Sequence, residues 1–246
     1  VSSAGDINGD GLSDIVVGVP LFDRSTVSAD SGAVFVIFGR PDCTDVDLRL
    51  FNVTTPLGFR LMGVPTVNAY TGYSVSSAGD FNHDGYGDII IGARQASGAG
   101  RVTAGTAYIF YGHSFSTPFL GQFLNTLNYP TGLIMNGAAA GDNFGFSVSG
   151  AGDINGDGID DVLVGAPFHK VNGLNSVGMS YIIYGFDSSV KTLTNMDMLT
   201  VTTDYVKYIT GVNANDFSGF CVSRAGDVNN DGGADVIVGA NGADPL

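Results

Sequence analysis

Four short apolar runs recur along the chain, each preceded by an aspartate and closed by a glycine. They are rich in β-branched residues and lie between polar segments that contain glycine. An apolar run of this length between turn-forming residues predicts a β-strand that is buried on both faces. The four predicted strands cover 14–18, 88–92, 161–165 and 235–239.

These runs belong to an internal repeat. The segment Val-Ser-Ser-Ala-Gly-Asp at the start of the chain returns in closely related form at Val75, Val148 and Val222, at intervals of 74, 73 and 74 residues. A fixed period of this length indicates a repeat architecture with one structural unit per period. The expected units are 1–74, 75–147, 148–221 and a partial fourth unit, 222–246.

Two further strands follow the buried run in each unit. The third strand is bounded by glycine at both ends, and the fourth, which is weaker, ends near Gly63, Gly137 and Gly211. The third strands are expected at 32–39, 105–112 and 178–185. Four strands joined by glycine-rich turns are typical of a β-propeller blade, so we predict an all-β fold of four-stranded antiparallel blades. A β-solenoid is the main alternative, although its coils are usually shorter.

The number of units predicts a larger assembly. Propellers close with ~4–8 blades, whereas this chain has three whole units and the first two strands of a fourth. Because both ends of the chain also fall inside a unit, we expect a piece of a longer or processed protein. An open array of blades along a fibre is the other possibility.

Composition agrees with a β-rich binding protein. The 246 residues are 44% hydrophobic and include 37 glycines, and all 24 acidic residues are aspartate. Aspartate and glycine favour turns, so little helix is expected. The formal net charge of −14 argues against nucleic acid and against an anionic membrane surface as partners. No apolar run approaches the ~18 residues that would span a membrane.

A polar loop precedes each buried run and has the pattern Asp-x-Asn-x-Asp-Gly-x-x-Asp in all four units. Side-chain oxygens at positions 1, 3 and 5 are expected to face one centre, and the glycine at position 6 permits the sharp turn. The position-7 backbone carbonyl and the position-9 aspartate complete the candidate cage. The candidate ligands are Asp6, Asn8, Asp10, Leu12 and Asp14; Asp80, Asn82, Asp84, Tyr86 and Asp88; Asp153, Asn155, Asp157, Ile159 and Asp161; and Asp227, Asn229, Asp231, Gly233 and Asp235.

Oxygen ligands of this kind predict a calcium site. Several carboxylates suit a hard cation, and flexible chain oxygens favour Ca²⁺ over Mg²⁺. Zinc is disfavoured because no Cys or His lies at a ligand position, and His83, at position 4, is expected to point outward. Up to four ions, one per loop, would change the formal charge from −14 to −6. The alternative is that these loops are ordinary turns, which four copies in register disfavour.

The third unit adds two flanking motifs, Phe144-Gly145 before the loop and Gly165-Ala166-Pro167 after the strand. With the loops, they resemble the FG-GAP repeat of integrin α-subunit propellers, and the long period is more similar to tandem FG-GAP proteins of bacteria, algae and protists. The glycine is kept in the other units, but Thr71 and Ser218 replace the phenylalanine. The resemblance implies a seven-bladed propeller with Ca²⁺ loops on one face and ligand contacts on the other.

The remaining candidates do not indicate catalysis. His113 and His169 occupy non-equivalent positions without a nucleophile motif, so both are interpreted as surface residues. Asn52-Val53-Thr54 is a possible N-glycan site at Asn52 in the variable loop. Cys43 and Cys221 lie in different units, and their pairing is left open. The aromatic residues within 108–111 and 181–184 are expected to pack in the core.

Together these features predict a calcium-stabilised, non-enzymatic module that is extracellular or at the cell surface. The expected partner is a protein or glycan ligand, or further copies of the same repeat. A structural unit of an extracellular fibre is one alternative. An accessory domain of a secreted hydrolase is another, with the catalytic residues outside this segment.

Overall fold

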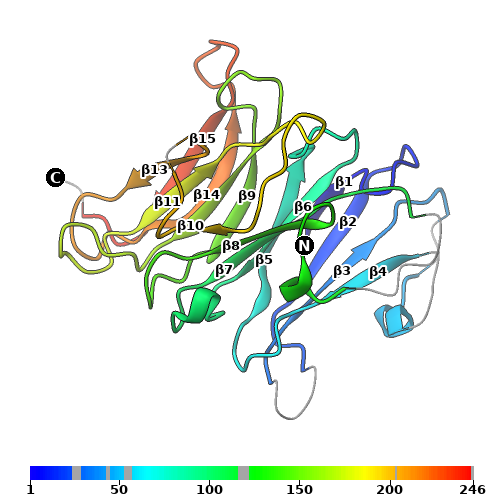
Figure 1. Cartoon of the computed structure of the whole chain (residues 1–246), viewed down its shortest axis with the longest axis horizontal. Helices are drawn as coiled ribbons and strands as arrows, with labels where there is room; N and C mark the ends of the chain where they lie inside the picture. The colour runs from blue at the N-terminus through cyan, green and yellow to red at the C-terminus, as the bar shows by residue number, and fades with distance from the viewer. Residues whose placement is uncertain (24–28, 43–44, 53–56, 116–121, 203, 245–246) are drawn as a thin grey trace.

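The computed structural model describes residues 1–246 except 24–28, 43–44, 53–56, 116–121, 203 and 245–246. The described part contains β-strands and three short 3₁₀ segments, with no α-helix. No helix in this part is long and apolar enough to cross a membrane. The strands form four sheets that stand side by side in chain order, from the blue sheet at the N-terminus to the red strand near the C-terminus (Figure 1).

Each sheet is built from consecutive strands. The first contains β1 (Ser2–Gly5), β2 (Asp14–Val19), β3 (Ala33–Ile37) and β4 (Gly58–Met62). The second contains β5 (Thr71–Gly79), β6 (Asp88–Ala93), β7 (Thr106–Phe110) and β8 (Gly132–Asn136), with β12 (Met196–Asp197) added at its edge. The third contains β9 (Ser147–Gly152), β10 (Asp161–Ala166), β11 (Met179–Ile183) and β13 (Val206–Thr210), and the fourth pairs β14 (Ser218–Gly226) with β15 (Asp235–Ala240). The 3₁₀ segments are η1 (Leu48–Asn52), η2 (Gly98–Gly100) and η3 (Leu124–Thr126).

The strand order confirms the prediction of four-stranded antiparallel blades. Within each sheet, consecutive strands pair antiparallel, as in β9–β10–β11–β13. Together with the repeat, this arrangement is that of propeller blades, three of them complete and one with two strands. The inner strands of successive sheets, such as β5 and β9, pack against each other. The predicted solenoid alternative is therefore not the fold.

The second strand of a sheet is buried as predicted only in the second and third sheets, which lie in the middle of the row of four sheets. Every residue of β6 and β10 is buried. In β2, however, Ile15 is 46% exposed, and in β15, Ile237 is 60% exposed. The prediction of burial on both faces was wrong for these two strands. Each belongs to a sheet at one end of the row, where a neighbouring sheet covers only one face (Figure 1).

The predicted aromatic core is confirmed except at Tyr184, which is half-buried. Tyr108, Phe110 and Tyr181 are buried, and the Tyr181 ring meets the Phe144 ring edge-on with centroids 5.0 Å apart. The positions equivalent to Phe144 in the other units are also buried, with Thr71 at 0% and Ser218 at 4% exposure. A small side chain therefore fills this position where the phenylalanine is missing.

The long connections between third and fourth strands reach the preceding sheet. Strand β12, which lies in the connection between β11 and β13, pairs in parallel with β8 of the second sheet. In the equivalent connection of the second unit, the Gln122 carbonyl oxygen accepts a hydrogen bond from the N–H of Met62 in β4 at 2.9 Å. The sequence did not predict this contact, because these connections are the least alike part of the units.

A glycine in the middle of each blade allows the sheets to approach closely. A Cβ atom at Gly18, Gly92 or Gly165 would overlap the carbonyl oxygen of a glycine in or just before the inner strand of the next sheet. For Gly165 that glycine is Gly219, whose φ of +85° also favours glycine. The Gly-Ala segment after each loop is thus a contact between blades.

Replacing Gly165 with alanine is expected to destabilise the fold by about 1–3 kcal/mol, because the added methyl group forces the third and fourth sheets apart. The matched control is Gly239→Ala at the equivalent position of the last unit, where the nearest atoms belong to Cys221 at 3.6 Å. The control should unfold close to the parent protein. Urea denaturation followed by circular dichroism measures both. Equal stability of the two variants would show that the contact between sheets does not constrain this position.

Candidate metal centre

The four polar loops occupy equivalent places in the blades. Each one leaves the inner strand of its sheet and enters the buried second strand, as between β1 and β2. The glycine at position 6 takes a positive φ in every loop, +86° at Gly11 and +85° at Gly158. A residue with a Cβ atom rarely adopts this conformation, so glycine makes the tight turn possible.

The aspartate at position 1 organises the loop backbone. In the first loop, Asp6 Oδ1 accepts the N–H groups of Gly9 at 2.8 Å and Asp10 at 3.0 Å, and Oδ2 accepts the N–H of Gly11 at 2.9 Å. The bonds from the residues at positions 5 and 6 recur at Asp80, Asp153 and Asp227. The position-1 carboxylate therefore stabilises the turn by accepting hydrogen bonds from the backbone of the loop.

The residues at positions 3 and 5 are bonded to each other. Asn8 donates from Nδ2 to Asp10 Oδ2 at 2.9 Å, and Asn8 Oδ1 accepts the N–H of Asp10 at 2.9 Å. Asp10 Oδ1 in turn accepts the N–H of Leu12 at 2.8 Å. The same three bonds occur in the other loops. Positions 1, 3 and 5 thus share one hydrogen-bonded turn, while the predicted convergence of their oxygens on a cation stays a prediction.

The position-9 aspartate has an additional role that sequence reasoning missed. Asp14 Oδ2 accepts the N–H of Ile7 at 2.8 Å, and Oδ1 accepts the N–H of Gly39, beyond the third strand, at 2.7 Å. Asp88 and Asp161 make the equivalent pair of bonds. This carboxylate therefore joins the loop to the third strand. The nearly constant spacing between the aspartate and the glycine, 25, 24 and 24 residues, was the available signal.

Neighbouring loops are also connected across the blades. The N–H of Gly87, at position 8 of the second loop, donates to the carbonyl oxygen of Asp6 at 2.8 Å. The N–H of Asp80 donates to Asp160 Oδ2, in the third loop, at 3.0 Å. The N–H of Ala234 donates to the carbonyl oxygen of Asp153 at 3.1 Å. A change of conformation in one loop is therefore transmitted to the next.

Negative charge is concentrated in the loops. Burial raises the pKa of the position-9 carboxyls Asp14, Asp88 and Asp161, the last to about 6. Repulsion from the aspartates at positions 1 and 5 of the same loop raises each pKa further, while backbone N–H donors oppose the shift. In the described part of the chain no Lys or Arg forms an ion pair with a loop aspartate. The repulsion therefore has no compensating basic side chain there.

The side-chain oxygen atoms of each loop are chemically suited to bind a hard cation. Each loop offers three carboxylates and one amide oxygen within nine residues, and Ca²⁺ takes ~6–8 oxygen ligands. Among the residues that the structure describes, no three His, Cys, Asp or Glu side chains gather closely enough to form a ready-made metal cluster. The carboxylate oxygens of the loop aspartates accept hydrogen bonds from backbone N–H groups instead. A carboxylate oxygen has two lone pairs, so it can accept such a bond and also contact a cation.

The other candidate residues lie away from the loop centres. His83 is exposed at position 4 with φ of +54°, as predicted. His113 and His169 are half-buried, so their interpretation as surface residues was wrong. The His169 ring lies with Nδ1 2.7 Å from Oδ2 of the buried Asp142, and the His113 ring packs on Phe115.

Two further predictions fall partly outside the described residues. Cys43 lies in the segment that the structure does not describe, while Cys221 is exposed and has no disulfide partner among the described residues. Val53 and Thr54 of the glycan sequon also lie outside the described residues. Use of Asn52 as a glycan site stays a prediction.

The geometry of the blades and loops agrees with the comparisons to known proteins. The FG-GAP repeat family matches residues 1–37, 71–110 and 144–183, which include the first three loops. Integrin alpha-4 of Xenopus laevis is 34% identical over 164 residues, which are 66% of this chain and 14% of that protein. Integrin alpha-IIb of Mus musculus is 33% identical over 165 residues, 65% of this chain and 14% of that protein.

A second group of relatives carries an enzyme name. Phosphatidylinositol-glycan-specific phospholipase D of Bos taurus is 32% identical over 136 residues, 55% of this chain and 15% of that protein. The chain thus spans only a small share of the length of the curated relatives it matches, and what it has in common with them is the repeat. This chain therefore contains three FG-GAP repeats and is similar to the integrin alpha subunits.

Proposed function

We propose that this chain is a calcium-stabilised, extracellular, integrin-like module that mediates adhesion or recognition of a protein or glycan ligand and catalyses no reaction. Its structural units are 1–74, 75–147, 148–221 and the partial unit 222–246. The observation that carries the proposal is the oxygen-rich turn, repeated four times at the same place in the blade. Similarity to integrin alpha subunits supports the recognition role and the extracellular location.

Each loop holds one Ca²⁺ ion through the side chains at positions 1, 3, 5 and 9 and the carbonyl group at position 7. In the third loop these are Asp153, Asn155, Asp157, Asp161 and Ile159. The ion supplies positive charge that cancels the repulsion among the three carboxylates. The turn then keeps its shape, and the first and second strands that it joins stay aligned.

The role of the ion is structural. The same aspartates already hold the loop backbone and the third strand through hydrogen bonds, so the cation stabilises a connection of the fold. The relatives named phospholipase D support one alternative, in which the blades accompany a hydrolase domain elsewhere in the protein. A lipase or phosphodiesterase assay of the full-length protein separates that alternative from a binding module.

Calcium titration by isothermal calorimetry tests the metal sites directly. The parent protein is expected to bind up to four ions, and the double variant Asp153→Ala/Asp157→Ala is expected to bind one ion fewer, because two of three carboxylates in one loop are removed. Asp204→Ala, at an exposed aspartate outside the loops, is the matched control and should keep the parent stoichiometry. An unchanged stoichiometry in the double variant would refute the assignment of these ligands.

A further inference from the structure

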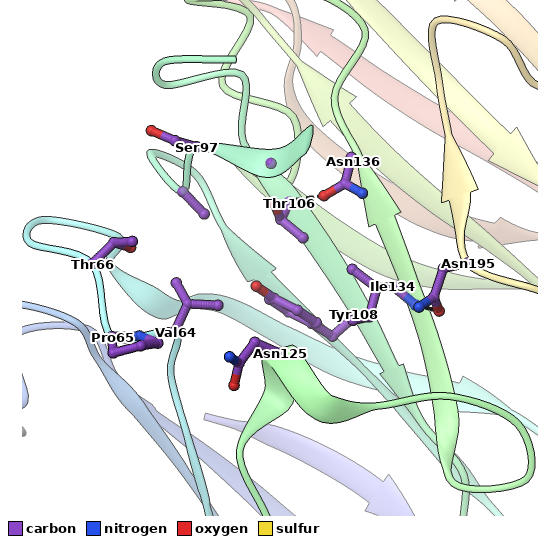
Figure 2. A pocket seen from close by; sticks show the side chains of 12 residues that line it. Val64, Pro65, Thr66, Ser97, Thr106, Tyr108, Asn125, Ile134, Asn136 and Asn195 are labelled. Carbon is purple, nitrogen blue, oxygen red and sulfur yellow. Dashed lines mark hydrogen bonds between the residues drawn. The ribbon is translucent and has the colours of Figure 1, made fainter. Parts of the chain in front are cut away.

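A polar pocket lies between the first and second sheets, near their outer strands. Its volume is about 400 Å³, within the ~300–1,000 Å³ range of small-molecule sites. Its walls come from three units: Val64 and Thr66 follow β4, Tyr108 and Asn136 belong to the second sheet, and Asn195 precedes β12. The pocket therefore depends on the packing of neighbouring blades. Figure 2 shows the Tyr108 side chain at its centre, between the Val64 side and the asparagines of the opposite wall.

The lining of the pocket is neutral, with hydrogen-bonding groups on one part and apolar groups on another. Three side-chain amides, from Asn125, Asn136 and Asn195, face it together with hydroxyl groups that include that of Tyr108. No charged side chain is among the residues that line it. Ile134 and the Val64 region supply apolar surface. A ligand that matches these walls has many hydroxyl groups, an apolar face and no charge.

One pair of polar residues in the pocket is specific to the second unit. Thr106 faces Asn136 in register across the β7–β8 pair, whereas Tyr108 faces Ile134. At the same register positions the first sheet has Ala33, Phe35 and Met62, and the third sheet has Met179, Tyr181 and Thr210. A blade therefore forms without a threonine and an asparagine at these places. Because folding does not require these polar groups, a ligand is a better explanation for them.

Part of the wall is held rigidly in place. Asn195 Oδ1 accepts the N–H of Ile134 at 2.8 Å, which fixes the amide beside β8. Two residues further on, Asp197 forms an ion pair with Arg101 at 2.6 Å, and Arg101 also donates to the carbonyl oxygen of Gly137. These contacts hold the β12 segment against the second sheet. A site with prearranged groups loses little entropy when it binds a ligand.

Hydrogen-bonding capacity remains at the pocket. Asn136 Oδ1 accepts a long bond from Thr106 Oγ1 at 3.4 Å, while its NH₂ group donates to no other described residue. The exposed Asn125 side chain, on η3, makes no hydrogen bond to another described residue. Tyr108 is 1% exposed, so its ring is fixed in the sheet and only its edge is presented to the pocket. The NH₂ groups of Asn125 and Asn136 can therefore donate to a ligand without breaking bonds of the fold, while the Tyr108 hydroxyl also shares a hydrogen bond with Thr106.

The geometry points to a binding site for one neutral sugar residue of a glycan, held by the amides of Asn125, Asn136 and Asn195 and the hydroxyl of Tyr108. This inference rests on the proposed recognition role and specifies its ligand class. The amides bind sugar hydroxyl groups as both donors and acceptors, and the Val64 and Ile134 side chains contact the C–H face of the ring. A charged ligand would leave its charge uncompensated in this pocket.

Side-chain amide NMR tests the inference on the calcium-loaded, ¹⁵N-labelled protein. The probes are the methyl glycosides of glucose, galactose, mannose and N-acetylglucosamine, with N-acetylneuraminic acid as the charged comparison. At least one neutral glycoside is expected to shift the amide signals of Asn125 and Asn136 in a saturable way. Asn125→Ala and Asn136→Ala should each weaken that binding by about tenfold, since each removes hydrogen bonds to the ligand. Asn128→Ala, on the same exposed connection, should bind as the parent does.

Three outcomes would overturn the inference: no shift with any neutral glycoside, stronger binding of the charged sugar, or binding that both variants leave unchanged. Circular dichroism of each variant shows that it is folded. The calcium sites are measured separately by the calorimetric titration. If the protein binds calcium as expected but binds no glycoside, the sugar site alone is refuted. If it binds a glycoside but does not bind calcium, the calcium proposal alone is refuted.

Discussion

Removing calcium with EDTA is expected to lower the melting temperature of this chain by more than about 10 °C near neutral pH. Extracellular calcium modules bind with Kd of ~10⁻⁴–10⁻³ M. At about 10 mM Ca²⁺, each site with such a Kd adds ~1.4–2.7 kcal/mol to the free energy of unfolding. Four loops act on the same fold, so their contributions accumulate. Differential scanning calorimetry with and without the chelator measures the shift.

The size of this effect follows from charge. Three carboxylates share each loop, and burial and mutual repulsion raise the pKa of the position-9 carboxyl, in Asp161 to about 6. Without a cation, the folded state near neutral pH must keep this buried group ionised against that repulsion. The connections between neighbouring loops, such as Gly87 N–H to the Asp6 carbonyl, spread the local strain to the next blade. A melting temperature that EDTA leaves unchanged would contradict the proposed role of the ions.

The pH dependence is the internal control of the same experiment. The Asp161 carboxyl has a higher pKa in the folded chain than in the unfolded chain, so the folded metal-free state binds more protons between its ordinary pKa of 3.8 and about 6. The stability of the metal-free protein should therefore fall as pH rises through this window. Calcium binding needs the ionised form, so the shift caused by EDTA should be smaller near pH 5 than near pH 7. An equal shift at both values would show that these carboxylates are not the groups involved.

The blade architecture could be predicted because its signals are local and repeated. Each second strand, such as Asp161–Ala166, is a continuous apolar run between turn residues, and each third strand is bounded by glycine. The period then assigned four strands to a unit. Burial at the ends of the row could not be predicted this way. Ile15 and Ile237 have the same local pattern as their buried counterparts, but the number of sheets that cover a strand depends on its place in the row.

Contacts between units were less visible in the sequence. The pairing of β12 with β8 involves two residues in a variable connection, and nothing in their local pattern indicates a strand. The pocket around Tyr108 likewise combines residues from three units, so no local pattern in the sequence indicates it. Tyr108 was correctly expected in the core, but its edge position in a pocket depends on Val64 and Asn195, which are distant in the sequence.

The turn in each loop could be predicted because Asp, Asn and Gly at fixed spacing favour a tight turn, whereas the role of these residues as calcium ligands stays a prediction. The pattern placed Asp80, Asn82 and Asp84 in one turn, and the structure has them hydrogen-bonded there. It did not indicate that Asp88 differs from the others. The partner of Asp88 just after the third strand, Gly112, is 24 residues away. A pattern of nine residues contains no information on such a partner.

Asp88→Ala is expected to destabilise the protein by about 3 kcal/mol or more even when EDTA is present, because three backbone donors lose their acceptor in a buried place. Asp88 is 0% exposed and accepts the N–H groups of Phe81 at 2.9 Å, Asn82 at 3.3 Å and Gly112 at 2.9 Å. Alanine offers no replacement, and the buried site admits little water. Urea denaturation in EDTA measures the loss.

The matched control in the same loop is Asp84→Ala. Asp84 is exposed, and its carboxylate accepts the Asn82 amide at 2.9 Å and the Tyr86 N–H at 3.0 Å, groups that water can satisfy after the change. In EDTA this variant should lose less than about 1 kcal/mol, whereas in calcium it should lose the contribution of one bound ion. If both variants lost stability only in calcium, Asp88 would act solely as a ligand. If Asp88→Ala alone is damaging in EDTA, its carboxylate connects the loop to the third strand whether or not a cation is bound.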